Sequence, residues 1–184
     1  QCALIAARQA WAQAFGSTAQ VDPERLAVSF SPGMGCVTTV MDAWDTLRTK
    51  GPRRVAPTTV PALMPNAPAA TLAMEFTARA GAHAPVSACA SGAEAISYGA
   101  DLISLGRADV VVAGGCDDAL HPLTVAAFAA MRALSTNPDP AGACRPFASD
   151  RDGFVLGQGA GSLVLEAESY AKARGAKILA YLDG

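Results

Sequence analysis

An uninterrupted apolar run near the middle of the chain limits the folds that this sequence can adopt. The run reads Ala108-Asp-Val-Val-Val-Ala113-Gly-Gly115, and its consecutive β-branched residues favour a strand. A strand that is apolar on both faces is typical of parallel sheets covered by helices on both sides. Helical patterns flank the run, at residues 93–106 and 122–133. This alternation predicts an α/β fold with a largely parallel sheet.

Other segments carry helix and strand signals of the same kind. Apolar spacing and terminal glycines predict helices at residues 3–15, 37–48, 67–80 and 168–174. Short apolar runs predict strands at residues 26–30, 86–89, 162–166 and 178–182. The proline-rich segment 52–66 is mostly uncharged, so we expect a packed irregular loop rather than a flexible linker. The first helix starts at once and the last strand has nothing after it to pair with, so we expect the sequence to be a fragment.

Residues 86–92, Val-Ser-Ala-Cys-Ala-Ser-Gly, place a single cysteine just before the helix predicted at 93–106. The small residues around Cys89 allow a sharp strand-to-helix turn. Free amides and the helix dipole meet at a helix N-terminus, and both favour thiolate over thiol. The helix is apolar nearly all round, so we expect it to be buried and to hold the turn rigid. These residues predict Cys89 either as a nucleophile or as a small buried apolar residue.

Composition excludes several classes of function. The 184 residues are 51% hydrophobic and 16% charged with a formal net charge of -2, which fits a globular domain and gives no support for a nucleic-acid partner. The cysteines are odd in number, 5, and lack metal-like spacing, so we expect a reduced, cytoplasmic protein without a metal site. Prolines interrupt the uncharged stretch 55–74, so we expect no membrane span, and we also expect no signal peptide.

The glycine spacing at 157–161, Gly-x-Gly-x-Gly, is similar to a nucleotide-binding loop. That motif requires a helix N-terminus after it, whereas a predicted strand follows here. We therefore expect these glycines to allow close backbone packing, and we predict no dinucleotide cofactor.

Neither histidine is an obvious base for Cys89. An extended strand would hold His83 roughly 15 to 20 Å from the sulfur, which is out of hydrogen-bond reach. His121 follows a different strand and can approach the same sheet edge, so it is either a candidate base or a structural histidine. The nearby acids are interpreted as solvated loop residues or turn-formers; they are Asp117, Asp118, Asp150 and Asp152.

Several motifs recur in a fixed order across nearly the whole chain. They are Ser87-Ala-Cys89-Ala-Ser91-Gly92, Arg107-Ala-Asp-Val-Val-Val-Ala-Gly114-Gly115, Arg132-Ala-Leu-Ser-Thr-Asn137, Arg145-Pro-Phe147 and Arg151-Asp-Gly-Phe-Val-Leu-Gly-Gln-Gly-Ala-Gly161. Together they resemble the β-ketoacyl-acyl carrier protein synthases, and most nearly the type II elongating enzymes of bacterial fatty acid synthesis. The resemblance implies a thiolase-like fold, an αβαβα layered sandwich in the full enzyme, of which residues 1–184 are most of the N-terminal half. It also implies a homodimer, no cofactor, and a decarboxylating Claisen condensation between an acyl chain and a malonyl group, both delivered by acyl carrier protein.

The resemblance also implies roles for particular residues. Cys89 matches the family's nucleophile, and its own amide matches one donor of the oxyanion hole, in agreement with the helix-mouth interpretation. Met34 matches a residue that gates the acyl pocket, and Phe128 matches one that lines it. Arginines match positions that meet the acidic carrier protein; they are Arg53, Arg54 and Arg132. Residues 58–64 match the segment that reaches across the dimer and helps to close the partner's pocket.

The sequence also departs from the family pattern. The catalytic histidines, the second oxyanion donor and a gating phenylalanine of the family have no counterpart here, so we expect that this chain does not complete a turnover. Cys36 stands where the family usually has glycine, which can alter the gate loop. Two alternatives remain: a non-catalytic subunit that shapes chain length in a heterodimer, and a thiolase-fold enzyme that acts on acyl-coenzyme A. The presence of Cys89 argues against the first, and the ordered motifs of residues 132–161 favour the carrier-protein branch over the second.

Overall fold

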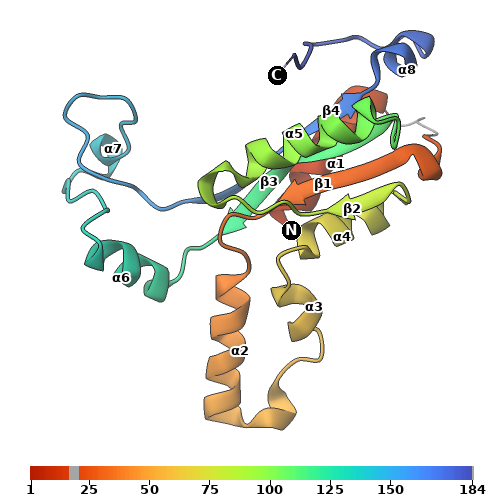
Figure 1. Ribbon diagram of the computed structural model, residues 1–184. Helices are drawn as coiled ribbons and strands as arrows, with labels where there is room; N and C mark the ends of the chain where they lie inside the picture. The colour runs from red at the N-terminus through yellow and green to blue at the C-terminus, as the bar shows by residue number, and fades with distance from the viewer. Residues whose placement is uncertain (17–20, 184) are drawn as a thin grey trace.

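The computed structural model describes residues 1–16 and 21–183, and its centre is a four-stranded mixed sheet (Figure 1). The strands are β1 (Leu26–Ser31), β2 (Gly81–His83), β3 (Val110–Asp118) and β4 (Gln158–Glu166), in the spatial order β2-β1-β3-β4. Strand β1 pairs in parallel with β2 and β3, whereas β4 is antiparallel to β3. The predicted α/β sheet is confirmed, with an antiparallel edge strand of the kind common in mixed sheets.

Helices cover both faces of the two central strands, as the uninterrupted valine run predicts. Every residue of β1 is buried, and so is the first half of β3. On one face, α1 (Cys2–Phe15) and α4 (Ala67–Glu75) pack on the side chains of Leu26, Val28 and Phe30. On the other face, α5 (Ser91–Ser104) packs through Leu102 on Ala27 and its strand neighbour Val111. Burying each such aliphatic side chain contributes about 1.5–3 kcal/mol, so this two-sided core holds the sheet and α5 together.

One prediction for α5 is wrong. The sequence predicts a helix buried all round, but the buried residues Ser91, Ala95, Gly99 and Leu102 lie along one side, and Leu105 at its end is 70% exposed. The sheet contacts only one side of the helix, and within the described residues no second layer covers the other side.

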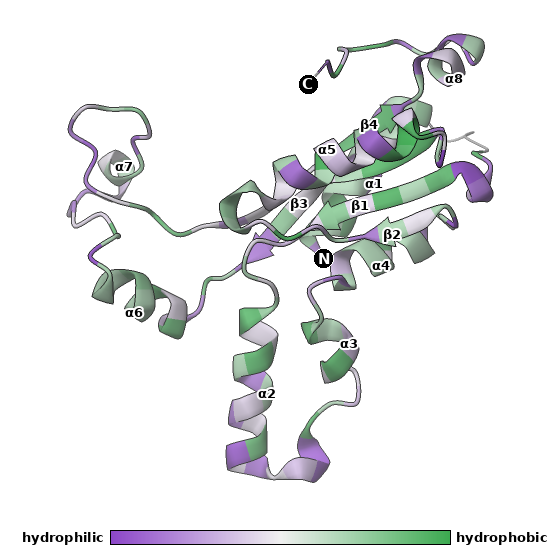
Figure 2. Ribbon diagram, in the orientation of Figure 1, coloured by the Kyte–Doolittle hydropathy of each residue, from purple (hydrophilic) through white to green (hydrophobic). Residues whose placement is uncertain are grey.

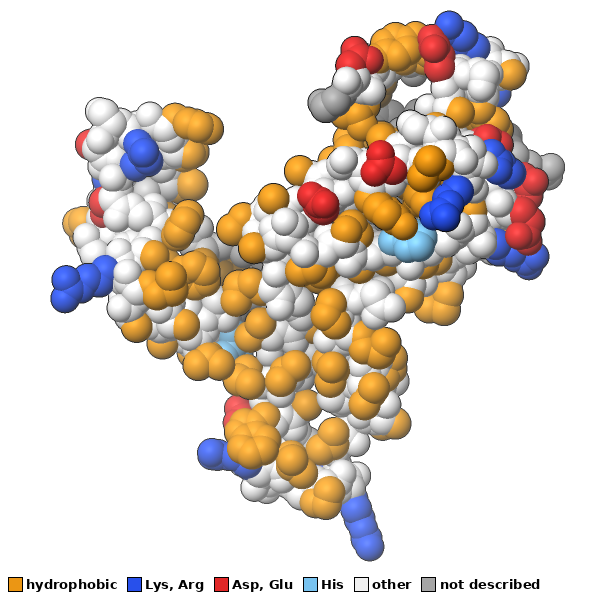
Figure 3. Space-filling model, in the orientation of Figure 1, with side chains coloured by type: hydrophobic (Ala, Val, Ile, Leu, Met, Phe, Trp, Pro, Cys, Tyr) orange, Lys and Arg blue, Asp and Glu red, His pale blue; other side chains and the backbone are white. Residues whose placement is uncertain are grey.

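Two arms project from the sheet (Figure 1). The first is α2 (Val37–Lys50), the short 3-10 helix η2 (Pro52–Arg54) and α3 (Thr59–Leu63); the second carries α6 (Pro122–Ala130) and α7 (Pro140–Ala143). Hydrophobic and hydrophilic residues alternate along the first arm (Figure 2), and hydrophobic side chains gather on its surface (Figure 3); the exposed ones include Val40, Trp44, Leu47 and Val60. The expectation of a packed loop at 52–66 is wrong, because these residues form two short helices whose side chains stay at least partly exposed.

Two predicted strands also fail to form. Residues 84–87 have no regular structure and lead into the 3-10 helix η3 (Ala88–Ala90), while the strand of this region is β2, earlier in the chain. Pro85 has no N–H to continue the β2 ladder beyond His83. Residues 178–182 follow α8 (Glu168–Ala173) without a strand partner, so their apolar pattern produces no sheet. The helix predicted at 67–80 ends at Glu75, five residues early, and α7 was not predicted; the other helices agree with prediction to within three residues. A further 3-10 helix, η1 (Pro23–Arg25), precedes β1.

Across residues 1–16 and 21–183, no helix combines the length and the hydropathy that a membrane crossing requires.

Candidate active site

Cys89 lies in a strained turn that opens directly into α5. The preceding residue, Ala88, has a positive φ of 48°, a conformation that costs an L-residue roughly 1–2 kcal/mol. The Ser91 hydroxyl stabilises the turn with two hydrogen bonds: it accepts from the Ser87 amide N–H at 2.8 Å and donates to the Ala88 carbonyl at 2.6 Å. Ser91 itself is 2% exposed, so its hydroxyl is fixed by packing as well as by these two bonds. The nucleophile candidate is therefore held on a rigid backbone.

Two glycines allow the start of α5 to lie directly on the sheet. A Cβ placed on Gly115 would lie 3.0 Å from the Cα of Gly92 and 3.0 Å from the carbonyl oxygen of Ser31. Both neighbours are backbone atoms, which have little freedom to move. Because Gly115 and Ser31 stand near the carboxyl ends of β3 and β1, this contact fixes Cys89 over that edge of the sheet. Ligands of open α/β sheets commonly bind at such an edge.

A cavity of about 600 Å³ opens beside the cysteine. Its lining combines the turn of Cys89, the ends of β1 and β3, and the start of β4; the residues are Ser31, Gly33, Ala88, Cys89, Ser91, Gly92, Ile96, Gly114, Gly115, Cys116, Asp117, Gly159, Ala160, Gly161, Ser162 and Leu163. The first amides of a helix have no intrahelical acceptor, so the start of α5 offers N–H groups and positive potential to this space. The cavity can therefore hold a group that reacts at sulfur and develops negative charge on oxygen.

The cysteines of this region differ in environment. Cys89 is exposed, whereas burial raises the pKa of the Cys116 thiol to about 11, with the nearby Asp117 carboxylate as the second cause. Burial also raises the pKa of Cys36. A thiol with a raised pKa is a poor source of thiolate near neutral pH. Of these cysteines, Cys89 is the one whose surroundings suit a nucleophile.

The glycines at 157–161 have a role different from the predicted one. Added Cβ atoms at Gly157, Gly159 and Gly161 would each meet open space within 4 Å, so close packing does not explain these residues. Gly159 and Gly161 belong to β4 and line the cavity beside Cys89. Their missing side chains leave room in the cavity rather than space for a neighbouring backbone.

Asp117 is a site residue that the sequence interpretation missed. Its carboxylate accepts the amide N–H groups of Gly33, at 2.8 Å, and Met34, at 3.1 Å, so it joins the end of β3 to the turn after β1. A signal was available in the sequence, because Asp117 directly follows the buried strand run and therefore stands at the same sheet edge as Cys89. A second acid interpreted as a loop residue, Asp152, accepts from the Ser135 hydroxyl at 2.7 Å and orders the second arm.

The other predicted site residues do not line the cavity in the described chain. The Met34 side chain is 50% exposed at the turn beside it, and Phe128 packs edge-on against Phe154 with ring centroids 6.1 Å apart. Arg53 and Arg54 are exposed at the tip of the first arm, and Arg132 is exposed in the second arm with a positive φ of 55°.

Both histidines have structural contacts. His83 lies edge-on to Tyr98 at 5.0 Å between ring centroids, and the Nδ1 atom of His121 accepts the Leu123 amide N–H at 3.1 Å at the start of α6. Within the described residues neither histidine has a hydrogen bond to Cys89, so the structural alternative for His121 is the supported one. The same residues contain no cluster of His, Cys, Asp or Glu able to hold a metal ion.

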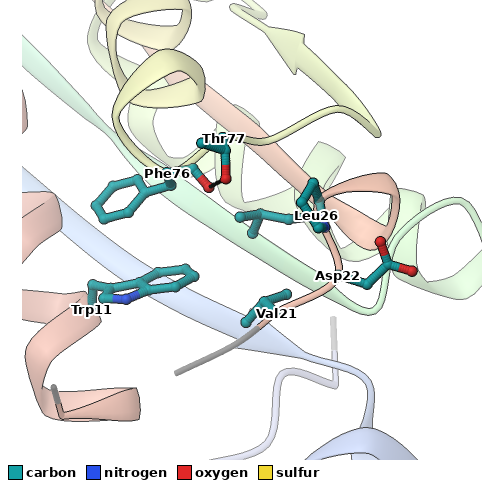
Figure 4. Close-up of a pocket in the computed structure, with 7 residues that line it drawn as sticks. Trp11, Val21, Asp22, Leu26, Phe76 and Thr77 are labelled. Carbon is teal, nitrogen blue, oxygen red and sulfur yellow. Dashed lines mark hydrogen bonds between the residues drawn. The ribbon is translucent and has the colours of Figure 1, made fainter. Parts of the chain in front are cut away.

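A second cavity, of about 540 Å³, lies at the opposite end of β1 (Figure 4). The rings of Trp11 and Phe76 stack against each other in its wall, with centroids 4.7 Å apart; the other lining residues are Val21, Asp22, Pro23, Leu26 and Thr77. Among the described residues its lining contains no cysteine or histidine, so the candidate active site is the cavity at Cys89.

Comparison with known proteins defines the class. The chain superposes on a β-ketoacyl synthase from Burkholderia phymatum with a TM-score of 0.82 and 33% identity, over 96% of this chain and 43% of that one. A ketosynthase of a type II polyketide system, solved with its acyl-carrier protein and bound to the hexaketide, gives a TM-score of 0.81 and 31% identity, over 97% of this chain and 45% of that one. These neighbours confirm the predicted thiolase-like fold.

The sequence comparison is more specific. The profile described as "Beta-ketoacyl synthase, N-terminal domain" matches residues 1–171, so the chain belongs to the β-ketoacyl synthase family. It is 45% identical over 98% of its length to 3-oxoacyl-[acyl-carrier-protein] synthase 2 of Mycobacterium tuberculosis, and 40% identical over 100% of its length to the enzyme of that name from Staphylococcus aureus. The chain spans 43% and 46% of these two relatives, which is less than half of each.

Proposed function

We propose that the protein containing this chain is a 3-oxoacyl-[acyl-carrier-protein] synthase that carries its acyl intermediate on Cys89. The observation that supports this most directly is the exposed cysteine in a strained turn at the head of α5, beside a cavity at the sheet edge. Relatives of 40–45% identity named as such synthases support the same reaction.

The condensation then proceeds in two half-reactions. The Cys89 thiolate attacks the carbonyl carbon of an acyl thioester on acyl carrier protein, the carbon–sulfur bond to the carrier breaks, and the carrier sulfur leaves as a thiolate that takes a proton from water. Malonyl carrier protein next loses carbon dioxide, and the electron pair of that bond becomes a carbanion. The carbanion attacks the acyl carbonyl on Cys89, the thioester bond breaks, and a β-ketoacyl carrier protein leaves with the thiolate restored. In both tetrahedral intermediates the Cys89 amide stabilises the oxyanion.

Other residues take the roles implied by the family. Met34 gates the acyl pocket and Phe128 lines it in the complete protein. Arg53, Arg54 and Arg132 bind acyl carrier protein, since each guanidinium is exposed and suits phosphate or carboxylate groups. The histidines of this chain have structural contacts, so residues outside it carry out the decarboxylation.

We further propose a cytoplasmic homodimer. Five free cysteines suit a reducing compartment. The exposed apolar side chains of the first arm, Val40, Trp44 and Val60 among them, suit a surface that another subunit covers. The segment 58–64, which contains α3, is the part of that arm that reaches the partner's pocket.

Two alternatives are distinguished from this function by the nucleophile and by the acyl donor: the chain-length subunit and the thiolase-fold enzyme. A chain-length subunit needs no cysteine nucleophile, and Cys89 with its supporting turn is complete here. A thiolase-fold enzyme would accept acyl-coenzyme A in place of the carrier-bound chain. Fatty acid synthesis and polyketide synthesis share the chemistry proposed. The chain is 45% identical to a 3-oxoacyl-[acyl-carrier-protein] synthase and 31% identical to the polyketide ketosynthase, which favours fatty acid synthesis.

The test is acylation of the complete protein, followed by intact mass and peptide mapping. We expect acyl carrier thioesters to add one acyl group at Cys89, and Cys89→Ser to abolish both this adduct and chain elongation. Cys144→Ala is the control, because Cys144 is also an exposed free cysteine but does not line the cavity. Normal elongation by Cys89→Ser would refute the function, and preferential acylation by acyl-coenzyme A would favour the thiolase-type alternative.

A further inference from the structure

The Asp117 carboxylate is bound by the backbone of another element. Asp117 stands near the end of β3, and its Oδ2 atom accepts the Gly33 amide at 2.8 Å and the Met34 amide at 3.1 Å. Its Oδ1 atom accepts the same Met34 amide at 3.3 Å. Within the described residues this carboxylate forms no ion pair with Lys, Arg or His. Its charge is therefore satisfied by two amides of one turn, through charge-assisted hydrogen bonds of the stronger kind.

The same turn touches the nucleophile's backbone. A Cβ on Gly33 would lie 2.7 Å from Asp117 Oδ2 and 2.9 Å from the carbonyl oxygen of Ala88, the residue just before Cys89. Gly33 thus fills a gap between the carboxylate and the cysteine turn that only a glycine fits. Any shift of Gly33 away from Asp117 changes its distance from the cysteine turn.

The far end of the turn is also tied to β3. The Thr38 hydroxyl, in the first turn of α2, donates to the Asp118 carbonyl at 3.0 Å. Met34, whose amide is bound by Asp117, has a half-exposed side chain, and Gly35, with a positive φ of 83°, lies between it and Thr38. Two neighbouring residues of β3 therefore hold both ends of the segment that carries Met34, but only Asp117 does so through its side chain.

From this geometry we infer that Asp117 is a positioning residue: its carboxylate fixes the Gly33–Met34 turn at the rim of the Cys89 cavity and so sets which acyl-chain lengths reach the sulfur. The inference rests on the proposed function, since it requires acylation at Cys89. Asp117 acts through the position of the Met34 backbone, whose amide its carboxylate accepts.

The experiment compares Asp117→Asn with Asp118→Asn in the complete enzyme. The two substitutions remove the same charge at adjacent positions, but the Asp118 side chain is exposed and its tie to Thr38 uses the backbone carbonyl, which asparagine retains. The measurement is the rate of Cys89 acylation by short and long acyl carrier thioesters. We expect Asp117→Asn to change the ratio of the long-chain to the short-chain rate by about tenfold, as the loss of one charge-assisted hydrogen bond allows. Asp118→Asn should leave the ratio unchanged. Asp117→Glu keeps a carboxylate, so its ratio should lie between those of Asp117→Asn and the wild type.

A second measurement keeps the inference testable if Asp117→Asn folds poorly. Amide hydrogen exchange in the wild-type enzyme should be slow in peptides covering residues 32–36, although the turn is at the surface, and should become faster in Asp117→Asn. Equal rate ratios for Asp117→Asn and Asp118→Asn in a folded enzyme would overturn the inference, as would fast exchange of this turn in the wild type. Failure of the wild type to acylate at Cys89 would instead refute the proposed function.

Discussion

Replacement of Ser91 by alanine tests whether the strained turn before α5 is what makes Cys89 reactive. The Ser91 hydroxyl accepts one backbone N–H and donates to the Ala88 carbonyl, and each such bond contributes about 1 kcal/mol net. These bonds offset the roughly 1–2 kcal/mol that the positive φ of Ala88 costs. Alanine at position 91 removes both bonds and leaves two backbone groups unpaired in a part-buried place.

We therefore expect Ser91→Ala to lower the free energy of unfolding of the complete enzyme by about 2–3 kcal/mol. If about 2 kcal/mol of this is lost from the reactive conformation of the turn, the rate constant for acylation of Cys89 falls by about 30-fold. Urea denaturation measures the first quantity, and single-turnover acylation followed by intact mass measures the second.

Ser97→Ala is the matched control for this substitution. Ser97 lies in the same helix but is exposed, and alanine is the better helix former, so the control should keep both stability and acylation. If Ser91→Ala acylates as fast as Ser97→Ala, the turn does not depend on the hydroxyl and the reasoning about Cys89 reactivity is wrong.

Two further predictions concern packing and pH. Gly115→Ala places a methyl group 3.0 Å from the Gly92 Cα, so we expect the free energy of unfolding, measured by urea denaturation, to fall by about 1–3 kcal/mol, and acylation of Cys89 to be lost. Gly157→Ala is the control; because the space around Gly157 is open, we expect it to change neither quantity. The Ser135 hydroxyl, followed by a backbone amide, holds the pKa of Asp152 below its usual value. A depressed folded-state pKa contributes stability above the unfolded pKa of about 4, which is lost as pH falls through the folded value. Asp152→Asn should therefore flatten the acid side of the stability–pH curve, and an unchanged acid limb would contradict the hydrogen-bond geometry.

Cys89 and Asp117 show which parts of the candidate site can be predicted from the sequence and which cannot. Local residues were sufficient to place Cys89 at the start of a helix, because small side chains before a helix signal define a helix N-terminus wherever the rest of the chain lies. They were insufficient for Asp117, whose partners Gly33 and Met34 are remote in sequence and meet it only because β1 and β3 are adjacent and parallel. A lone aspartate after a strand has the same local pattern as a turn-former, so composition alone could not separate the two.

The two wrong strand predictions share a physical cause. The run at 86–89 and the run at 178–182 have strand composition, but a strand forms only where a neighbouring strand accepts its hydrogen bonds, and no such neighbour pairs with either run in the described chain. The outer side of α5 lies exposed because it carries polar residues, Glu94, Ser97 and Asp101 among them; the prediction of all-round burial counted the apolar positions and not these.

The sequence by itself determined the α/β class, the buried valine strand, the helix mouth at Cys89 and membership of the β-ketoacyl synthase family, since these depend on local patterns and ordered motifs. The tertiary structure alone decided the strand order, the contact of Gly92 with Gly115 that fixes the cysteine over the sheet edge, and the hydrogen bonds from the Gly33–Met34 turn to Asp117. These contacts join residues far apart along the chain, and their geometry is set by the packing of the whole sheet.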